Sequence, residues 1–489
     1  MKPLELYFDP FRKNIVGIDS CYESPYGKQK IVYADWIASG RLYGPIEDKI
    51  KNDFGPFVAN THTETSETGT RMTYAYHHAH NMIKKHVNAG AGDILITAGS
   101  GMTGVINKLQ RILNYKICDM NMSKSFMQQE ERPLVFVTHM EHHSNHTSWL
   151  ETIADVEILK PDKELLVDPE SLRKQLKKHK SRKHKIVSLT ACSNVTGIET
   201  PYHEMAKIVH EAGGLCFVDF AASAPYVAID MHPKNPMESL DAIFFSPHKF
   251  LGGPGSAGVL VMKAALYDRK TPDHPGGGTV DWTNPWGMYK YVDSIEARED
   301  GGTPGFLQAI RSALAIELKE KMGAGNMRKR EEELVKIAFA GLRKIPGLHI
   351  LADNMEERLG CVSFYVDNIH YNLIVKLLSD RFGVQVRGGC TCAGTYGHYL
   401  LHVDRERSKL ITDLINQGDL SLKPGWVRLS LHPTMTDAEL HHVIDAMGQI
   451  VANIAGWEKD YTYSPTVNEF YHKKFPMKKD EILSDWFRL

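Results

Sequence analysis

Lys249 is the residue of this sequence whose surroundings point most directly to chemistry. It follows a short apolar run, residues 242–245, and precedes a glycine-rich turn at 251–253, so we expect its amine at the end of a buried strand. Most lysines are solvated, but burial lowers the pKa of a lysine and makes the uncharged amine available as a nucleophile. The segment therefore predicts imine formation with a carbonyl compound.

Asp219 ends another apolar run, residues 215–218, thirty residues before Lys249. A buried carboxylate at that place keeps a pyridine nitrogen protonated, so that the ring accepts electrons. The competing interpretation is an aspartate that caps the following helix. The pairing with Lys249 favours the first interpretation.

A glycine-rich turn at residues 97–104 lies between a predicted strand and a predicted helix. Free backbone N–H groups and the helix dipole favour an anion at such a turn. Its spacing matches neither a P-loop nor a dinucleotide-binding fingerprint. The expected phosphate contacts are three turn residues and two polar neighbours of the lysine: Ser100, Gly101, Met102, Ser246 and His248.

Histidines concentrate after the apolar run at 134–137, and His142 is placed to stack on an aromatic cofactor ring. A bound metal is the alternative, because histidines occur in two dense groups: His142, His143 and His146, and His77, His78 and His80. Neither group has a cysteine or carboxylate at a standard zinc spacing. We therefore expect a stacking role for His142 and no metal.

These features together meet the requirements of one cofactor. An imine-forming amine, an anion for a ring nitrogen, a phosphate cradle and a stacking side chain are what pyridoxal-5′-phosphate (PLP) needs. We expect PLP, held by Lys249 as a Schiff base.

Length and composition limit the class of protein. A chain of 489 residues predicts two domains with a shared cleft. The formal net charge of -1 gives no reason to expect nucleic acid or a membrane surface as a partner, and no apolar run reaches the roughly 18 residues that cross a bilayer. Seven scattered cysteines argue for a reducing compartment, so we expect a cytoplasmic enzyme.

Apolar runs alternate with segments of helical periodicity through the first three hundred or so residues. The predicted strands are 93–97, 133–137, 185–189, 215–219 and 242–245. Continuously apolar strands that alternate with helices predict an α/β fold, with a mostly parallel sheet covered by helices on both faces. Loops at the carboxyl ends of such strands form the site.

The pattern changes after Pro304. A helical stretch from Leu307 to about Ile345 leads to a second region, with predicted strands at 348–351, 361–366 and 426–430. The expected division is an N-terminal segment (1–30), a large PLP-binding domain (31–315), a smaller α+β C-terminal domain (316–456) and a C-terminal tail (457–489).

Several motifs resemble those of the cysteine desulfurase/selenocysteine lyase family, within the class V aminotransferase group of fold-type-I PLP enzymes. The motifs are 141–145 (Glu-His-His-Ser-Asn), 193–197 (Ser-Asn-Val-Thr-Gly), 246–249 (Ser-Pro-His-Lys) and 302–304 (Gly-Thr-Pro). The similarity extends from about Tyr33 to about Ala452. It implies a large PLP-binding domain with a smaller C-terminal domain.

The resemblance implies roles for individual residues. His142 stacks on the ring, Asp219 binds the pyridinium, and Asn194 lies near the cofactor oxygen and the substrate carboxylate. Thr303 reaches the phosphate of the neighbouring subunit, so a homodimer is expected.

Two later motifs bear on the reaction. Residues 387–392 (Arg-Gly-Gly-Cys-Thr-Cys) resemble the Arg-x-Gly-x-x-Cys loop that places the sulfur-accepting cysteine on Cys392, whereas Cys390 is better explained as structural. Arg428 matches the arginine that binds the substrate carboxylate, and Arg387 joins it among the substrate-binding residues. The implied reaction converts a small amino acid, L-cysteine or selenocysteine, to alanine and leaves a persulfide on Cys392 for a sulfur-acceptor protein.

One departure from the family bears on the reaction. Ala222 stands where the family usually has a glutamine that bonds the phenolic oxygen of the cofactor; Ser223 follows it and is included among the cofactor-binding residues. Other reactions of the group stay open: C–S β-elimination, epimerisation or transamination, with Cys392 structural. An inactive sulfur-transfer scaffold is a remoter alternative, because Lys249, Asp219 and Arg428 would have no purpose in it.

Overall fold

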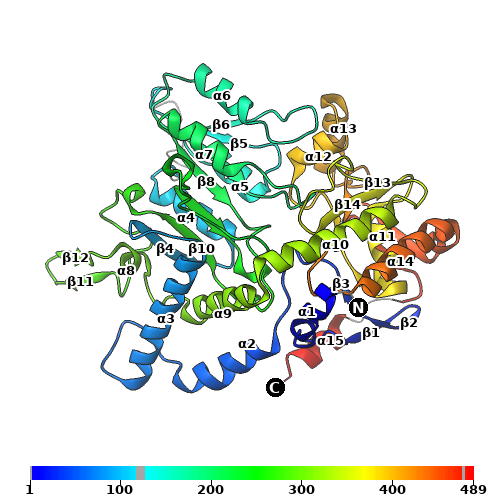
Figure 1. Cartoon of the computed structure of the whole chain (residues 1–489), viewed down its shortest axis with the longest axis horizontal. Helices are drawn as coiled ribbons and strands as arrows, with labels where there is room; N and C mark the ends of the chain where they lie inside the picture. The colour runs from blue at the N-terminus through cyan, green and yellow to red at the C-terminus, as the bar shows by residue number, and fades with distance from the viewer. Residues whose placement is uncertain (1–2, 117–126, 476–478, 489) are drawn as a thin grey trace.

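Apolar runs in the first half of the chain form a seven-stranded sheet in the computed structural model, which describes residues 3–116, 127–475 and 479–488 (Figure 1). In sheet order the strands are β4 (Asp93–Ala98), β10 (Gly258–Lys263), β9 (Ala242–Phe245), β8 (Leu215–Asp219), β7 (Lys185–Thr190), β5 (Leu134–Val137) and β6 (Asp155–Ile158). The strands from β9 to β6 are parallel, and β10 is antiparallel to both of its neighbours. The mostly parallel sheet predicted from the sequence is confirmed. Cys118, one of the seven cysteines, lies outside the described residues.

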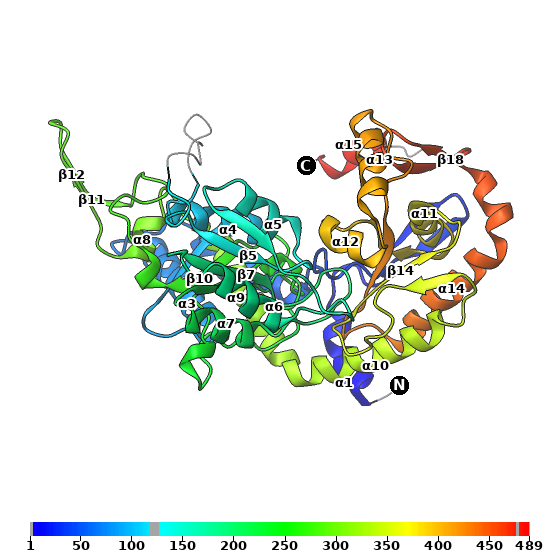
Figure 2. The same cartoon turned by 90° about the horizontal axis from the view of Figure 1, so that it is seen from above.

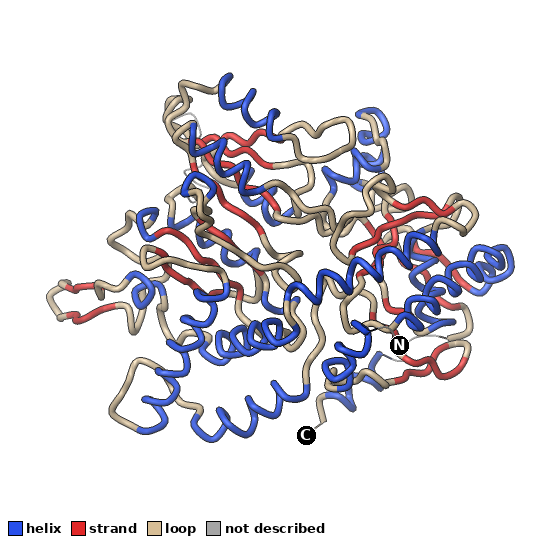
Figure 3. The backbone as a smooth tube through the Cα atoms, in the orientation of Figure 1, coloured by secondary structure: helices blue, strands red, loops and turns tan. Residues whose placement is uncertain are grey.

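Helices cover both faces of this sheet (Figure 3). Successive residues of β8 point to opposite faces: Phe217 belongs to one apolar cluster, and Cys216 and Val218 belong to another. Burial on both faces explains why these strands are continuously apolar. The covering helices are α4 (Met102–Ile112) and α5 (His143–Leu150) at the first cluster, and α3 (Glu67–His86), α6 (Pro169–Lys178) and α7 (Tyr202–Glu211) at the second.

The helical stretch predicted from Leu307 to about Ile345 is not one helix. It consists of α9 (Phe306–Met322) and α10 (Ala324–Leu342), which Gly323 separates. Gly323 has φ 75° and ψ 111°, a conformation that glycine adopts without a steric penalty from a Cβ atom. The break lets α9 pack against α3 while α10 packs against α14 (Asp437–Trp457), so the chain passes from one half of the molecule to the other.

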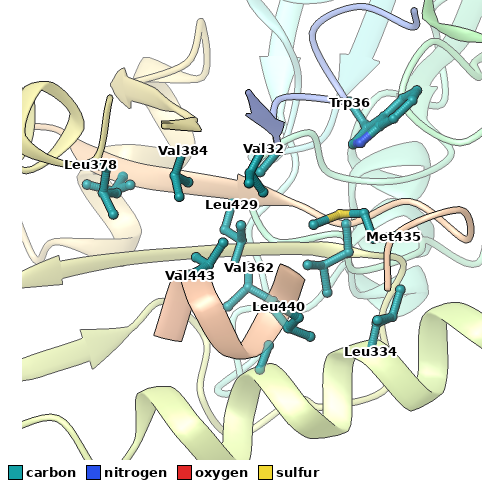
Figure 4. Close-up of a cluster of buried hydrophobic side chains, with 14 of the residues drawn as sticks. Val32, Trp36, Leu334, Val362, Leu378, Val384, Leu429, Met435, Leu440 and Val443 are labelled. Atoms are coloured by element: carbon teal, nitrogen blue, oxygen red, sulfur yellow. The ribbon is translucent and has the colours of Figure 1, made fainter. Parts of the chain in front are cut away.

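A four-stranded antiparallel sheet forms the second half. Its order is β13 (Leu348–Ile350), β14 (Cys361–Val366), β17 (Trp426–Ser430) and β16 (Arg387–Gly389). Figure 4 shows Val362 of β14 and Leu429 of β17 packed with Leu440 and Val443 of α14. The predicted strands at 348–351, 361–366 and 426–430 are confirmed, and β16 is an addition. The domain limits expected from the sequence stay predictions.

The remaining elements lie around these two halves. The hairpin of β11 (Val280–Thr283) and β12 (Tyr289–Tyr291) projects away from the large sheet (Figure 2). A second hairpin, β18 (Tyr461–Ser464) and β19 (Glu469–His472), packs on α11 (Tyr371–Phe382), where the Asn468 side chain donates to Tyr371 Oη at 2.7 Å. The other elements are α1 (Pro3–Lys13), β1 (Cys21–Ser24), β2 (Gly27–Lys30), α2 (Gly44–Lys49), α8 (Ile295–Glu299), α12 (Gly394–Leu400), α13 (Arg405–Asn416) and α15 (Lys479–Trp486).

Residues 32–41, which we name the bridging segment, connect the two halves at the site. Its strand β3 (Val32–Tyr33) pairs in parallel with β15 (Val384–Gln385), and Ser430 N donates to Ala34 O at 2.8 Å. Its other end reaches the lysine loop, since Gly40 N donates to His248 O at 2.9 Å. The bridging segment therefore fixes the second sheet against the loop that carries Lys249.

Gly40→Ala should lower the free energy of unfolding by about 3 kcal/mol, the upper end of what overpacking costs. A Cβ atom at position 40 would lie 1.9 Å from the backbone oxygen of Phe250, which has no freedom to rotate away. Denaturant unfolding measures the change. Gly92→Ala is the matched control, because its Cβ meets nothing within 4 Å; equal stabilities of the two variants would contradict the close approach.

Candidate active site

A cavity of about 560 Å³ lies at the carboxyl ends of the central strands, between the two halves. All but two of the site residues predicted from the sequence line it. They are Ser100, Gly101, Met102, His142, Asn194, Asp219, Ser246, His248, Lys249, Arg387, Cys392 and Arg428. Ser223 and Thr303 are absent from its walls.

Lys249 lies in the turn Pro247–Lys249, directly after β9. Burial lowers the pKa of Lys249 to about 8; Asp219 acts in the opposite direction, and Arg428 and Arg387 lower the value further. Its side chain lines the cavity. The lowered pKa makes the uncharged amine more available to a carbonyl compound near neutral pH than it is in a solvated lysine.

Asp219 ends β8 and is only 3% exposed. Burial raises the pKa of its carboxyl to about 6, while a hydrogen bond from Ala221 N to Oδ1 (2.8 Å) and the charge of Lys249 oppose the rise. Residues 221–226 form turns, so Asp219 caps no regular helix. Because the buried carboxylate has too little positive charge around it, a protonated ring nitrogen next to it would stabilise its charged form.

The glycine-rich turn predicted to hold a phosphate lies at the amino end of α4. Met102 N donates to Ser246 Oγ at 2.8 Å, so the lysine loop and the glycine-rich turn meet there. A Cβ on Gly101 would lie 2.9 Å from Ser246 Oγ, which explains the need for glycine. Burial lowers the pKa of His248 to about 4, so its imidazole carries no charge near neutral pH.

His142 caps α5 through its ring. Ser144 N donates to His142 Nδ1 at 3.1 Å, and this acceptor role places the proton of the neutral imidazole on Nε2. Burial, then Lys249, lowers the pKa of His142 to about 3. The ring is thus neutral and held in one orientation at the cavity.

Cys392 lies on a strained loop. Thr391 and Cys392 both have positive φ angles, 48° and 58°, which non-glycine residues rarely adopt. His143 holds the loop: its backbone N donates to Cys392 O at 2.8 Å and its Nε2 accepts from Gly394 N at 3.0 Å. The thiol-bearing residue is exposed and lines the cavity, whereas Cys390 is partly buried and does not line it.

Polar groups for a carboxylate meet on the side of the second sheet. Arg428, 3% exposed, donates to Asn194 O at 3.2 Å, and Asn194 Nδ2 donates to Thr391 O at 2.7 Å. Asn194 Oδ1 and Arg428 Nε are buried with no partner in the described part of the chain. Unpartnered buried polar atoms beside a cavity indicate a polar ligand.

Two expected residues lie elsewhere. Ser223 is buried, and its hydroxyl has no partner among residues 3–116, 127–475 and 479–488; Ala221 and Ala222 face the cavity in its place. Thr303 is exposed. Both cofactor-binding assignments stay predictions.

Glu141 and Asp35 were not identified from the sequence. Glu141 is buried with a pKa raised to about 7 by desolvation, and it accepts from Thr138 at the end of β5 and from Thr190 N (3.0 Å) at the end of β7. Its place directly before His142 was the available signal. Asp35 pairs with both cavity arginines, and no motif marked it.

Within residues 3–116, 127–475 and 479–488, no three His, Cys, Asp or Glu side chains are grouped so as to hold a metal ion. The helices of the same residues include none with the length and apolar character needed to cross a membrane.

The chain is similar to known proteins over most of its length. The family model "Aminotransferase class-V" matches residues 32–443. A probable cysteine desulfurase of Halalkalibacterium halodurans is 28% identical over 74% of this chain and 84% of its own, and one of Staphylococcus epidermidis is 29% identical over 76% and 85%. A cysteine desulfurase structure from Thermococcus onnurineus has a TM-score of 0.72 at 22% identity, covering 91% of this chain and 98% of its own.

The chain belongs to the class V aminotransferase family and has the type-I PLP fold. Enzymes of this family depend on PLP, and the residues present fit that cofactor. Lys249 would supply the amine, Asp219 the buried anion, and the α4 turn with Ser246 the phosphate cradle. The protein is a PLP-dependent enzyme.

Uptake of PLP by the cofactor-free protein should accelerate with rising pH through a midpoint near 8. Only the uncharged amine attacks the aldehyde, and burial lowers the pKa of Lys249 from 10.5 to about 8, so the reactive fraction grows across that range. Stopped-flow absorbance measures the rate. Lys249→Ala gives the background of non-covalent binding, and a rate that still climbs above about pH 10 would contradict the lowered pKa.

Proposed function

We propose that this enzyme is a cysteine desulfurase, which converts L-cysteine or selenocysteine to alanine. One observation carries the proposal: Cys392 lines the same cavity as Lys249, on a loop whose strained backbone is fixed by His143. The relatives named probable cysteine desulfurase support it. A purely structural cysteine needs neither exposure to the cavity nor strain.

The groups already described would hold the cofactor, which would supply an electron sink for carbanion chemistry at the substrate Cα. Arg428 and Asn194 orient the substrate carboxylate. Lys249 accepts the Cα proton as the free amine, the form that its lowered pKa makes more available than in a solvated lysine. His142 is neutral and covers the cavity without adding charge.

Cys392 then attacks the substrate sulfur as a thiolate. A bond forms between Cys392 Sγ and that sulfur, the bond between the sulfur and Cβ breaks, and Cβ takes the electron pair and a proton. L-Cysteine and the enzyme thiol thereby give L-alanine and an enzyme persulfide, without an external oxidant. The exposure of Cys392 suits discharge to a sulfur-acceptor protein.

Cys392→Ser should abolish sulfide release from L-cysteine, by a factor of at least about 100, because a hydroxyl does not form the persulfide. Sulfide and alanine are assayed together with a reducing thiol. Cys390→Ser is the matched control, two positions away and outside the cavity, and it should keep most of the activity. Pyruvate and ammonia in place of alanine, with no effect of Cys392→Ser, would establish C–S β-elimination instead.

We also propose a homodimer in which Thr303 serves the partner's site. Thr303 is exposed in this chain and does not line its own cavity, although the sequence associates it with the phosphate. Isologous dimers place such a residue at both sites at once.

The free thiols among the described cysteines are in keeping with a reducing, cytoplasmic location.

Co-expression of Lys249→Ala and Thr303→Asp chains should restore activity that each variant alone lacks. In the mixed dimer, one site combines the intact Lys249 of one chain with the intact Thr303 of the other, so about half of the wild-type activity is expected. Differently tagged chains allow the mixed dimer to be purified and assayed. An inactive mixed dimer, or a monomer that keeps its PLP, would exclude the shared site.

A further inference from the structure

Asp35 lies between two arginines that the sheet would otherwise force together. Arg387 of β16 and Arg428 of β17 are direct cross-strand partners. Like charges opposite each other destabilise a sheet. Asp35 Oδ1 accepts from Arg428 Nη2 at 2.8 Å, and its Oδ2 accepts from Arg387 Nε at 3.1 Å. One carboxylate therefore holds both guanidinium groups.

The backbone fixes the Asp35 carboxylate in that place. Asp35 belongs to the bridging segment and forms an isolated parallel bridge with Ser430, at the end of β17. Ala38 N donates to Asp35 O at 3.0 Å, and Ser430 N donates to the preceding carbonyl, Ala34 O, at 2.8 Å. Its side chain is 13% exposed, and Asp35 is absent from the cavity wall, whereas both arginines line it. Asp35 thus acts on a ligand only through the arginines.

The charge at the carboxylate-binding end of the cavity follows from this pairing. Two guanidinium groups and one carboxylate leave a single net positive charge for a ligand. His142 adds no charge, because burial lowers its pKa to about 3. Asp219 also lines the cavity, and its negative charge acts on Lys249. One carboxylate of a ligand balances this single positive charge. A second carboxylate finds no positive charge left and is repelled by Asp35.

We propose that Asp35 determines specificity: it restricts the site to amino acids with one carboxylate and discriminates against those with an acidic side chain. The inference rests on the proposed function in that it names the substrate class of the same site. Arg387 and Arg428 bind the ligand, and Asp35 is a positioning residue that sets their orientation and net charge. Removing its charge converts the site into one for doubly anionic amino acids.

The test compares binding of L-alanine and L-aspartate to the PLP-loaded enzyme by isothermal titration calorimetry, so it requires no turnover and no sulfur chemistry. The wild-type enzyme should bind L-alanine more tightly than L-aspartate. Asp35→Asn keeps the shape of the side chain and removes its charge, so the ratio of the two affinities should shift toward L-aspartate by roughly tenfold. Asp35→Glu keeps the charge and should keep the wild-type preference.

Asp353→Asn is the matched control, because Asp353 pairs with Arg343 outside the cavity. The ratio of the affinities of this variant for L-alanine and L-aspartate should equal that of the wild type. If Asp35 only stabilises the sheet, Asp35→Asn weakens both ligands equally and the ratio is unchanged, which overturns the proposal. If Asp35→Asn does not fold, Asp35→Glu supplies the test. Loss of its preference for L-alanine over L-aspartate would then overturn the proposal. Absence of sulfide from L-cysteine with a shifted ratio would refute desulfuration and leave the specificity role intact.

Discussion

The burial of the Lys249 amine opposite the Asp219 carboxylate is the interaction on which the site depends. Burial lowers the pKa of the lysine and raises that of the aspartate, and their mutual attraction limits both shifts. The only hydrogen bond to either side chain that stabilises its charge within the described residues is the one from Ala221 N to Asp219 Oδ1. The site is therefore prepared for a cofactor that brings an aldehyde to one group and a cationic ring nitrogen to the other.

The bridging segment keeps this arrangement aligned with the substrate-binding side. Lys249 follows a strand of the large sheet, whereas Arg387 and Arg428 lie on the small one, and residues 32–41 are hydrogen-bonded to both. Gly40 permits contact with the lysine loop that any side chain would prevent. A separate contact holds the strained loop at Cys392, because His143 ties that loop to the start of α5. Strain persists where surrounding contacts fix the backbone in this way.

Much of the fold was predictable because its strands are short, apolar and buried on both faces, so their signal is local. The strands that contain Asp219 and precede Lys249 appear where the sequence places them. The single helix expected after Leu307 was wrong, since a glycine inside a helical pattern is usually tolerated. Only the packing of α9 and α10 on different partners shows that Gly323 ends one helix and begins another.

The sequence by itself determined the PLP chemistry: an amine, a carboxylate and a glycine-rich turn next to buried strands are local features, and parallel strands bring their carboxyl ends together. Tertiary structure decided what depends on contacts between distant residues. Asp35 lies 352 positions from Arg387, and only the pairing of the bridging segment with the second sheet brings them into contact. The same holds for Glu141, which joins the ends of β5 and β7. Residue types at long separation carry no local signal, so the charge of the substrate site was set by the fold.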